Sequence, residues 1–276
     1  NISLDRLSHL GFASGRFRVS LLPGDTLSAS SSVLGLRQNK DAKTGVVYVR
    51  SVGRNQRGEM VLDYCRWVMV RKRDPSAPAP EPLVPEFPEA VAGSELIVPP
   101  LLDLRGYDRT LAGSPYLWED YEVGERIDHV DGLTIEEADH MLATRLYQNT
   151  ARVHFNQHAE KDGRFGRRIV YGGHIISLAR SLSFNGLGNA FKLVAINGGR
   201  HVAPSFAGDT IYAWSEVLDK TTLPGHEDVG VLRIRTVATK DRPGHDFPFK
   251  DAEGRYDPAV VLDFDYQVLI PRRGDA

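Results

Sequence analysis

The stretch from Ile169 to Asn185 reads Ile-Val-Tyr-Gly-Gly-His-Ile-Ile-Ser-Leu-Ala-Arg-Ser-Leu-Ser-Phe-Asn. From about His174 to Asn185 its apolar residues fall on nearly every side of a helix, whereas a surface helix keeps one polar face. Such a helix has to be buried, because its apolar surface would otherwise meet water all around. We therefore predict an α+β fold in which an antiparallel sheet wraps around this helix.

The segment before the buried helix predicts a strand and another helix. Residues 126–133 have the pattern of a strand. Thr134 is followed three residues later by Glu137, the spacing of a capping box, and a helical pattern then runs to Leu146. These elements belong to a unit that begins near Pro115.

The chain contains an internal repeat. Three blocks align in order at a nearly constant offset: 15–27 on 199–211, 45–52 on 230–237, and 61–64 on 261–264. The blocks are rich in β-branched residues with period-two alternation, and the first contains a Gly-Asp turn. We predict two like units, each ending in the same three or four antiparallel strands.

Charged residues recur within this repeat. Arg50 with Asp63 in the first unit corresponds to Arg235 with Asp263 in the second. Because both units keep them, we predict structural roles for these residues.

The first unit has no counterpart of the two helices or of the opening strand. Only Leu4, Leu7 and Leu10 suggest a helix end before Gly11. A curved sheet with no helix would expose a large apolar face. Since the sequence starts at Asn1, we expect the missing N-terminal part to exist in the native protein; the alternative is a helix borrowed from elsewhere.

Eight of the sixteen prolines fall between residues 75 and 100. Such a stretch cannot form a central strand and favours extended polyproline II. We predict a semi-rigid tether, with a disordered linker as the alternative. The chain then divides into a first unit at 1–74, a linker at 75–114 and a second unit at 115–276.

The composition of 276 residues, 41% hydrophobic and 25% charged with a net charge of −2, is that of a soluble globular protein. The longest basic run is Arg71-Lys72-Arg73, which gives no support for nucleic-acid binding. Cys65 is the only cysteine, and no apolar run reaches the length of a membrane span. We expect a cytoplasmic protein.

A second stretch carries the chemistry: residues 146–154 read Leu-Tyr-Gln-Asn-Thr-Ala-Arg-Val-His. Adding water beside a thioester requires a base for the water, an acid for the α-carbon and donors for the enolate oxygen. His154 can do the first two jobs. Backbone N–H groups of Gly172 or Gly173 can do the third, because a helix start leaves them unpaired.

The buried helix, the wrapped sheet and the repeat together resemble the double hot-dog arrangement of MaoC-like dehydratases and R-specific enoyl-CoA hydratases. Their motif Asp-x-Asn-Pro-x-His aligns with 149–154, and the His-Gly pair that opens their helix aligns with Tyr171-Gly172. The second unit matches over its whole length. Several phrases are similar to the mesaconyl-CoA hydratase (β-methylmalyl-CoA dehydratase) branch, and they lie at 146–156, 166–168, 183–187 and, in the first unit, 15–73.

This resemblance implies a double hot-dog fold with two antiparallel sheets, each wrapped around a long apolar helix, the first hot-dog being incomplete in this chain. It also implies that the second unit is active, whereas the first supports it and helps to form the acyl-CoA cleft. We expect a homo-oligomer.

The chain departs from the family motif at three positions. Asn149 stands for the family's Asp, Ala151 for its Asn and Arg152 for its Pro. An amide cannot take a proton from water near neutral pH, so the shared Asp/His mechanism cannot apply unchanged. Either His154 carries more of the proton transfer, or a carboxylate reaches in, and the nearest in sequence are Glu137, Asp139 and Glu160.

The other candidate site residues each have a plainer alternative. Asn149 either positions water or caps the following turn. Gly172 either donates to the oxyanion or only allows close packing. Arg152, with Arg145 and Arg180 behind it, either binds a substrate carboxylate or forms an ordinary ion pair.

A further group is expected to border the substrate. His174 is predicted to lie in the first helical turn, facing solvent or the substrate edge. The arginines that follow His154 either bind CoA phosphates or lie in a solvated loop. The substrate-binding set is therefore Arg152, Tyr171, Gly173, His174, Arg167 and Arg168, with Arg164 as a further candidate for the phosphates.

From these residues and the resemblance, we expect a hydro-lyase that reversibly hydrates an enoyl-CoA thioester, mesaconyl-CoA to β-methylmalyl-CoA. The alternatives are a hydratase for ordinary 2-enoyl-CoA, a thioesterase, and a non-catalytic acyl-CoA-binding protein. We expect no metal and no cofactor apart from the CoA of the substrate.

Overall fold

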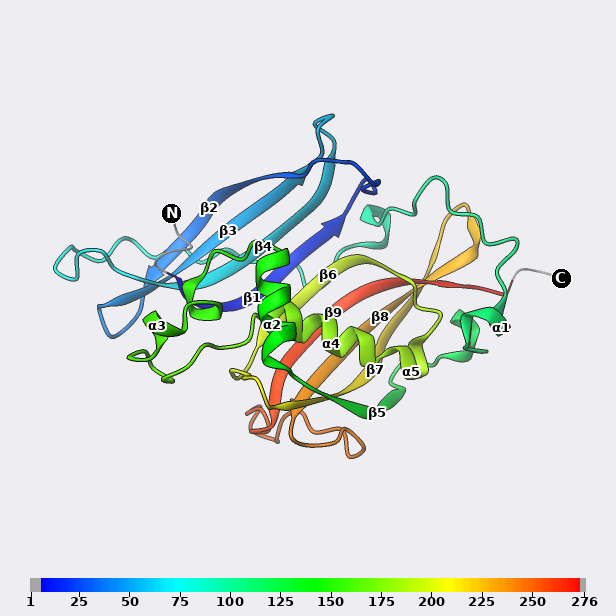
Figure 1. The fold of residues 1–276 in the computed structure, drawn as a ribbon. Helices are drawn as coiled ribbons and strands as arrows, with labels where there is room; N and C mark the ends of the chain where they lie inside the picture. The colour runs from blue at the N-terminus through cyan, green and yellow to red at the C-terminus, as the bar shows by residue number, and fades with distance from the viewer. Residues whose placement is uncertain (1–5, 274–276) are drawn as a thin grey trace.

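The structure is a computed structural model that describes residues 6–273 (Figure 1). Its strands are β1 (Arg6–Phe17), β2 (Ser28–Gln38), β3 (Thr44–Arg54), β4 (Met60–Arg71), β5 (Arg126–Thr134), β6 (Lys192–His201), β7 (Thr210–Leu223), β8 (His226–Lys240) and β9 (Val260–Pro271). Its α-helices are α1 (Arg109–Ala112), α2 (Glu137–Leu146), α3 (Gln157–Glu160), α4 (Gly172–Leu182) and α5 (Phe184–Leu187). Short 3-10 helices are η1 (Gly93–Glu95), η2 (Trp118–Asp120) and η3 (Arg152–His154).

All nine strands form one antiparallel sheet in the order β2-β3-β4-β1-β6-β9-β8-β7-β5. The prediction of two separate sheets is therefore wrong. Strands β1 and β6 pair with each other and join the two halves. Each would otherwise be an edge strand with unpaired backbone groups, and their pairing satisfies both.

The repeat predicted from the sequence is present as β1–β4 and β6–β9. At the junction, Phe12 pairs with Gly199 and Gly15 with Ile196. In the repeat, Gly15 aligns with Gly199 and Phe12 aligns with Ile196. Exchanging the two units therefore turns one pair into the other, as an approximate twofold axis between β1 and β6 requires.

The recurring charged residues form equivalent ion pairs. Arg50 Nη2 lies 2.6 Å from Asp63 Oδ2, and Arg235 Nε lies 3.5 Å from Asp263 Oδ1. Their predicted structural role is confirmed.

Helix α4 lies against the second half of the sheet, as predicted, although it ends at Leu182 and continues past a kink into α5. Non-helical backbone angles at Asn185 and Gly186 make the kink. One apolar cluster joins the buried face of α4 to β7, β8 and β9 and includes Ile175, Ala179, Leu182, Leu232, Phe264, Val268 and Ile270. Within the described residues, no helix covers the first half in this way.

Two local predictions fail. Leu7 and Leu10 lie in strand β1, where pairing with β4 outweighs their helical spacing, and Leu4 lies outside the described residues. Thr134 is the last residue of β5 and its hydroxyl bonds to that of Thr210. Helix α2 begins one residue after Glu136 without a side-chain cap, so the capping box is absent, although the helix itself is confirmed.

The proline-rich segment crosses the face of the sheet opposite α4. Val91 is held at both backbone groups, its N–H donating to Asn197 Oδ1 and its C=O accepting from Gln267 Nε2. Further along, the segment packs onto Val194, Leu223, Val229, Val231 and Leu269 through Leu96, Val98, Leu102 and Leu104. Leu269 alternates along β9 with Val268 and Ile270 of the α4 cluster, which places the two clusters on opposite faces.

Among residues 6–273, no helix is long and apolar enough to span a membrane.

Candidate active site

His154 is held in η3 by a short network of backbone contacts. Asn149 Oδ1 accepts from the N–H of Ala151 at 2.9 Å, which fixes the turn before η3. The His154 side chain is 8% exposed, and its Nδ1 lies 3.1 Å from the carbonyl oxygen of Ile169. Since a carbonyl only accepts, Nδ1 carries a proton and Nε2 is the basic nitrogen of the neutral ring.

For Asn149, the structure therefore shows the turn-capping role of its oxygen. Its amide nitrogen is a hydrogen-bond donor.

The start of α4 adjoins this histidine. The rings of His154 and Tyr171 meet edge to face with centroids 5.8 Å apart. Tyr171 precedes Gly172, the first residue of α4, whose N–H has no partner within the helix. A Cβ on Gly173 would overlap the Tyr171 ring at 2.4 Å, so this glycine is needed for the ring's position.

The structure adds His201, which the sequence analysis did not single out. A Cβ on Gly172 would lie 2.5 Å from His201 Nε2, so this imidazole lies directly against the start of α4. Burial lowers the pKa of His201 to about 4, and the ring is therefore neutral near pH 7. His9 and Phe12 lie beside it, with ring centroids 5.7 and 6.0 Å away.

A signal for His201 exists in the repeat. His201 aligns with Phe17 of the first unit, so an imidazole has replaced an apolar ring at one position of two like strands.

The carboxylate suggested as an alternative base is engaged elsewhere. Glu137 forms an ion pair with Arg168 and lies 3.7 Å from His140 Nε2. Arg168 also contacts the sulfur of Met141. Arg168 is a candidate for binding CoA phosphates, but its charge is already neutralised by Glu137 of α2. Asp139 is exposed on α2, and Glu160 ends α3.

The other arginines differ in environment. Arg180, a candidate for the substrate carboxylate, donates instead to Ser183 Oγ, Tyr266 OH and the carbonyl of Ala190. It is a core residue well along α4. The remaining candidates are exposed, and these are Arg145, Arg152, Arg164 and Arg167. The guanidinium of Arg167 stacks over the Phe206 ring, 3.9 Å from its centroid.

His174 lies in the first turn of α4, as predicted, but it is partly buried. Its Nε2 is buried without a hydrogen-bond partner, and burial together with the nearby His140 lowers its pKa. It faces its neighbours in the protein rather than open solvent.

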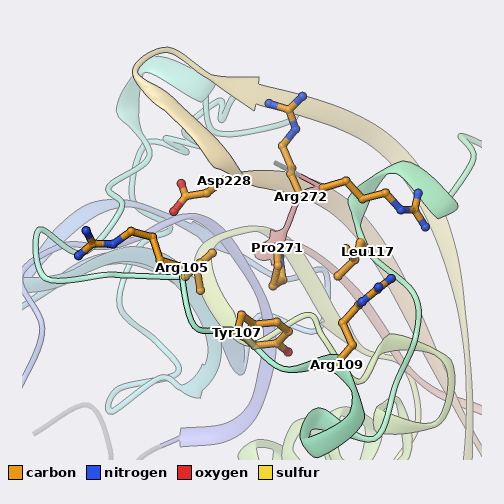
Figure 2. Close-up of a pocket in the computed structure, with 9 residues that line it drawn as sticks. Arg105, Tyr107, Arg109, Leu117, Asp228, Pro271 and Arg272 are labelled. Atoms are coloured by element: carbon orange, nitrogen blue, oxygen red, sulfur yellow. The ribbon is translucent and has the colours of Figure 1, made fainter. Parts of the chain in front are cut away.

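A hollow of about 420 Å³ lies far from these histidines (Figure 2). His201 pairs with Leu262 near one end of β9, whereas the hollow is lined by Pro271 at the other end. Three of its four guanidinium groups have acidic partners, which are Arg105 with Asp103, Arg272 with Glu119 and Arg273 with Asp120. The candidate active site is therefore the group around the start of α4.

The described residues contain no group of three or more His, Cys, Asp or Glu side chains placed to hold a metal ion.

No protein-family model matches the chain. It is 70% identical to a β-methylmalyl-CoA dehydratase from Chloroflexus aurantiacus and 56% identical to a mesaconyl-CoA hydratase from Cereibacter sphaeroides, each time over 99% of this chain and 78% of the relative.

Solved structures agree with the fold. A MaoC-domain protein dehydratase from C. aurantiacus superposes with a TM-score of 0.95 at 70% identity, over 99% of this chain and 78% of that one. A Mycobacterium tuberculosis protein with a double hot-dog fold superposes with a TM-score of 0.67 at 24% identity, covering 97% and 76%.

The repeated strands and the helix cradled by the second half define a double hot-dog protein. With relatives at 56% and 70% identity over nearly its whole length, the chain belongs to the MaoC-like dehydratase family.

Proposed function

We propose that this protein is a hydro-lyase that reversibly converts mesaconyl-CoA to β-methylmalyl-CoA. The observation that supports this most is the identity of 70% and 56% to two relatives with those names, over 99% of the chain. The site is consistent with it, because His154 and the glycine start of α4 lie side by side.

In the hydration direction, the oxygen of water bonds to the β-carbon while a base takes one of its protons. The double bond shifts toward the thioester, which becomes an enolate, and an acid then protonates the α-carbon. The N–H of Gly172 at the positive end of α4 stabilises the enolate oxygen. Asn149 orients the water through its amide.

Two imidazoles border the start of α4, and the proton transfers fall to His154. His154 borders the start of α4 through Tyr171, and His201 borders it through Gly172. His154 Nε2, the basic nitrogen of the neutral ring, accepts the proton of water, and the imidazolium so formed supplies the α-proton. Burial keeps the His201 ring neutral near pH 7, and this ring packs against Gly172 and positions the start of α4. His154 is neutral again at the end of the cycle, and one molecule of water has been added across the double bond.

The division of labour along the chain follows the same proposal. Residues 115–276 carry the reacting groups, residues 1–74 support them, and Arg167 at the exposed edge contacts CoA phosphates. Placement in the cytoplasm and a homo-oligomeric assembly stay predictions from the sequence.

The direct test is turnover of mesaconyl-CoA, followed by loss of the enoyl-thioester absorbance and by detection of β-methylmalyl-CoA. His154→Ala should lower kcat by at least about 10²-fold, the usual scale for a general acid or base, with substrate binding retained. His245→Ala, at an exposed position, is the matched control.

Each alternative has its own result in this assay. Faster turnover of crotonyl-CoA than of mesaconyl-CoA would indicate an ordinary enoyl-CoA hydratase. Tight binding of both thioesters without any absorbance change would indicate a binding protein instead. Near-normal activity of folded His154→Ala would end the assignment of proton transfer to this residue.

A further inference from the structure

The first half of the sheet carries an unpaired cation on the same face as the candidate active site. Arg66 lies in β4 and pairs with Phe12 of β1, so both side chains point to one face. A Cβ on Gly199 would contact both Phe12 and Phe264, and Phe264 belongs to the cluster under α4. Arg66 therefore faces the side of the sheet on which α4 lies.

Arg66 is partly buried and has no anionic partner in the part of the chain that the structure describes. Its Nε is shielded from water without a hydrogen-bond acceptor. Within residues 6–273 it forms no ion pair, whereas its neighbour on the opposite face of β4, Asp63, is paired with Arg50. A guanidinium that is shielded at Nε and has no anionic partner is costly, so its presence is explained best by an anion that binds there.

The two halves differ at this face in a way that supports a ligand. By the repeat, Phe12, Tyr64 and Arg66 correspond to Ile196, Phe264 and Tyr266. The second set packs in the apolar cluster beneath α4. The first half thus has a cation, Arg66, at the position where the second half has the buried Tyr266.

Arg66 lies within reach of the reacting groups. His201 on β6 and Arg66 on β4 are separated by the single strand β1, and His201 lies two residues further along β6 than Gly199, which is level with Arg66. Their backbones are therefore about 12 Å apart. Phe12 lies between them, paired with Arg66 and 6.0 Å from the His201 ring. A short acyl group bound at His201 therefore extends toward the guanidinium.

We propose that Arg66 binds the free carboxylate of a dicarboxylic enoyl-CoA and so sets the specificity for such substrates. This inference rests on the proposed function for the identity of the acyl group. In β-methylmalyl-CoA the carbon that bears the hydroxyl also bears the carboxylate, so a cation that binds this group must lie near the imidazoles. The first half of the sheet thereby contributes a substrate contact of its own.

Arg152, the candidate from the sequence, competes for the same role. It is exposed in η3, where water screens its charge, so its pairing with a carboxylate contributes less. The two assignments make opposite predictions for two arginine substitutions.

The test is binding of two saturated thioesters, succinyl-CoA and butyryl-CoA, measured by titration calorimetry. Both acyl groups have four carbons, and they differ in a terminal carboxylate. The wild-type protein should prefer succinyl-CoA. Arg66→Gln should weaken succinyl-CoA binding by about 30- to 1,000-fold, the range for removing one partner of a desolvated charge pair, and change butyryl-CoA binding little. Arg66→Lys should weaken succinyl-CoA binding less than Arg66→Gln does, since lysine keeps the charge but not the bidentate geometry.

The control is Arg71→Gln, which removes a guanidinium from an exposed position of the same strand and should leave both affinities unchanged. Three results would overturn the inference: no preference for succinyl-CoA in the wild type, equal losses on both thioesters in folded Arg66→Gln, or the selective loss in Arg152→Gln instead. Failure of the proposed function is distinguishable, because it would leave this binding preference intact while mesaconyl-CoA is not hydrated.

Discussion

Substituting Gly172 by alanine tests whether His201 has to lie against the start of α4. The added Cβ would be 2.5 Å from His201 Nε2 and 2.6 Å from Cε1, whereas ordinary contact begins at 3.4 Å. Either the imidazole or the helix start must therefore move by close to 1 Å. A misplacement of about 1 Å can cost about 10²-fold in rate, equivalent to about 2.7 kcal/mol of transition-state stabilisation.

The fold should survive this change. Alanine in place of glycine favours a helix by up to about 1 kcal/mol, and overpacking costs about 1–3 kcal/mol, so the net loss of stability is at most about 3 kcal/mol. Activity and stability can then be separated by measuring kcat/KM on mesaconyl-CoA together with a thermal melt. Gly106→Ala is the control, because its Cβ would meet nothing within 4 Å.

A double-mutant cycle identifies the cause. If the clash with His201 is responsible, Gly172→Ala should cost about 10²-fold in the wild-type background but less than about twofold in His201→Ala, where no imidazole remains to be displaced. Equal costs in both backgrounds would show that the methyl group acts on the helix start itself. No cost in the wild type would refute the requirement for the ring at this place.

Three further predictions concern water, the core and pH. Asn149→Ala should lower kcat and also stability, by about 1 kcal/mol for the lost turn cap; unchanged kcat would exclude positioning of the water by its amide. Ile175 is 3% exposed where α4 packs on the sheet, so Ile175→Ala should lower the free energy of unfolding by about 2–5 kcal/mol and Ile175→Val by about 0.5–1.5 kcal/mol. Denaturant titration measures both changes, and equal, small losses would mean that α4 is loosely packed. His129 is fully buried and its pKa is lowered from 6.5 to about 4, so the unfolded chain binds the proton first and stability is lost as pH falls from 6.5 toward 4. This loss should be on the order of 3 kcal/mol and should shrink in His129→Gln; an equally steep pH dependence in the variant would assign it to other groups.

The sequence by itself determined the features that depend on local pattern and on the repeat. The apolar run after Gly172 predicted a helix packed against the sheet, and the aligned blocks predicted both sets of strands. Burial on every side was wrong, because α4 buries Ile175, Ala179 and Leu182 on one face while Ser177 and Ser181 are exposed. Arg50 with Asp63 and Arg235 with Asp263 could be predicted as structural because both units keep them. His154 and the glycines of α4 could be found because they lie close together along the chain.

The tertiary structure decided what depends on contacts between distant strands. Pairing of β1 with β6 merged two expected sheets into one. Pairing of β1 with β4 turned a segment with leucines at helical spacing into a strand, because backbone pairing outweighs local preference. His201 and Arg66 are 47 and 88 residues from His154 in the sequence, and only the sheet brings the first against Gly172 and turns the second to the same face. Side-chain direction in a sheet follows from register, and register is fixed by pairing partners that no local pattern specifies.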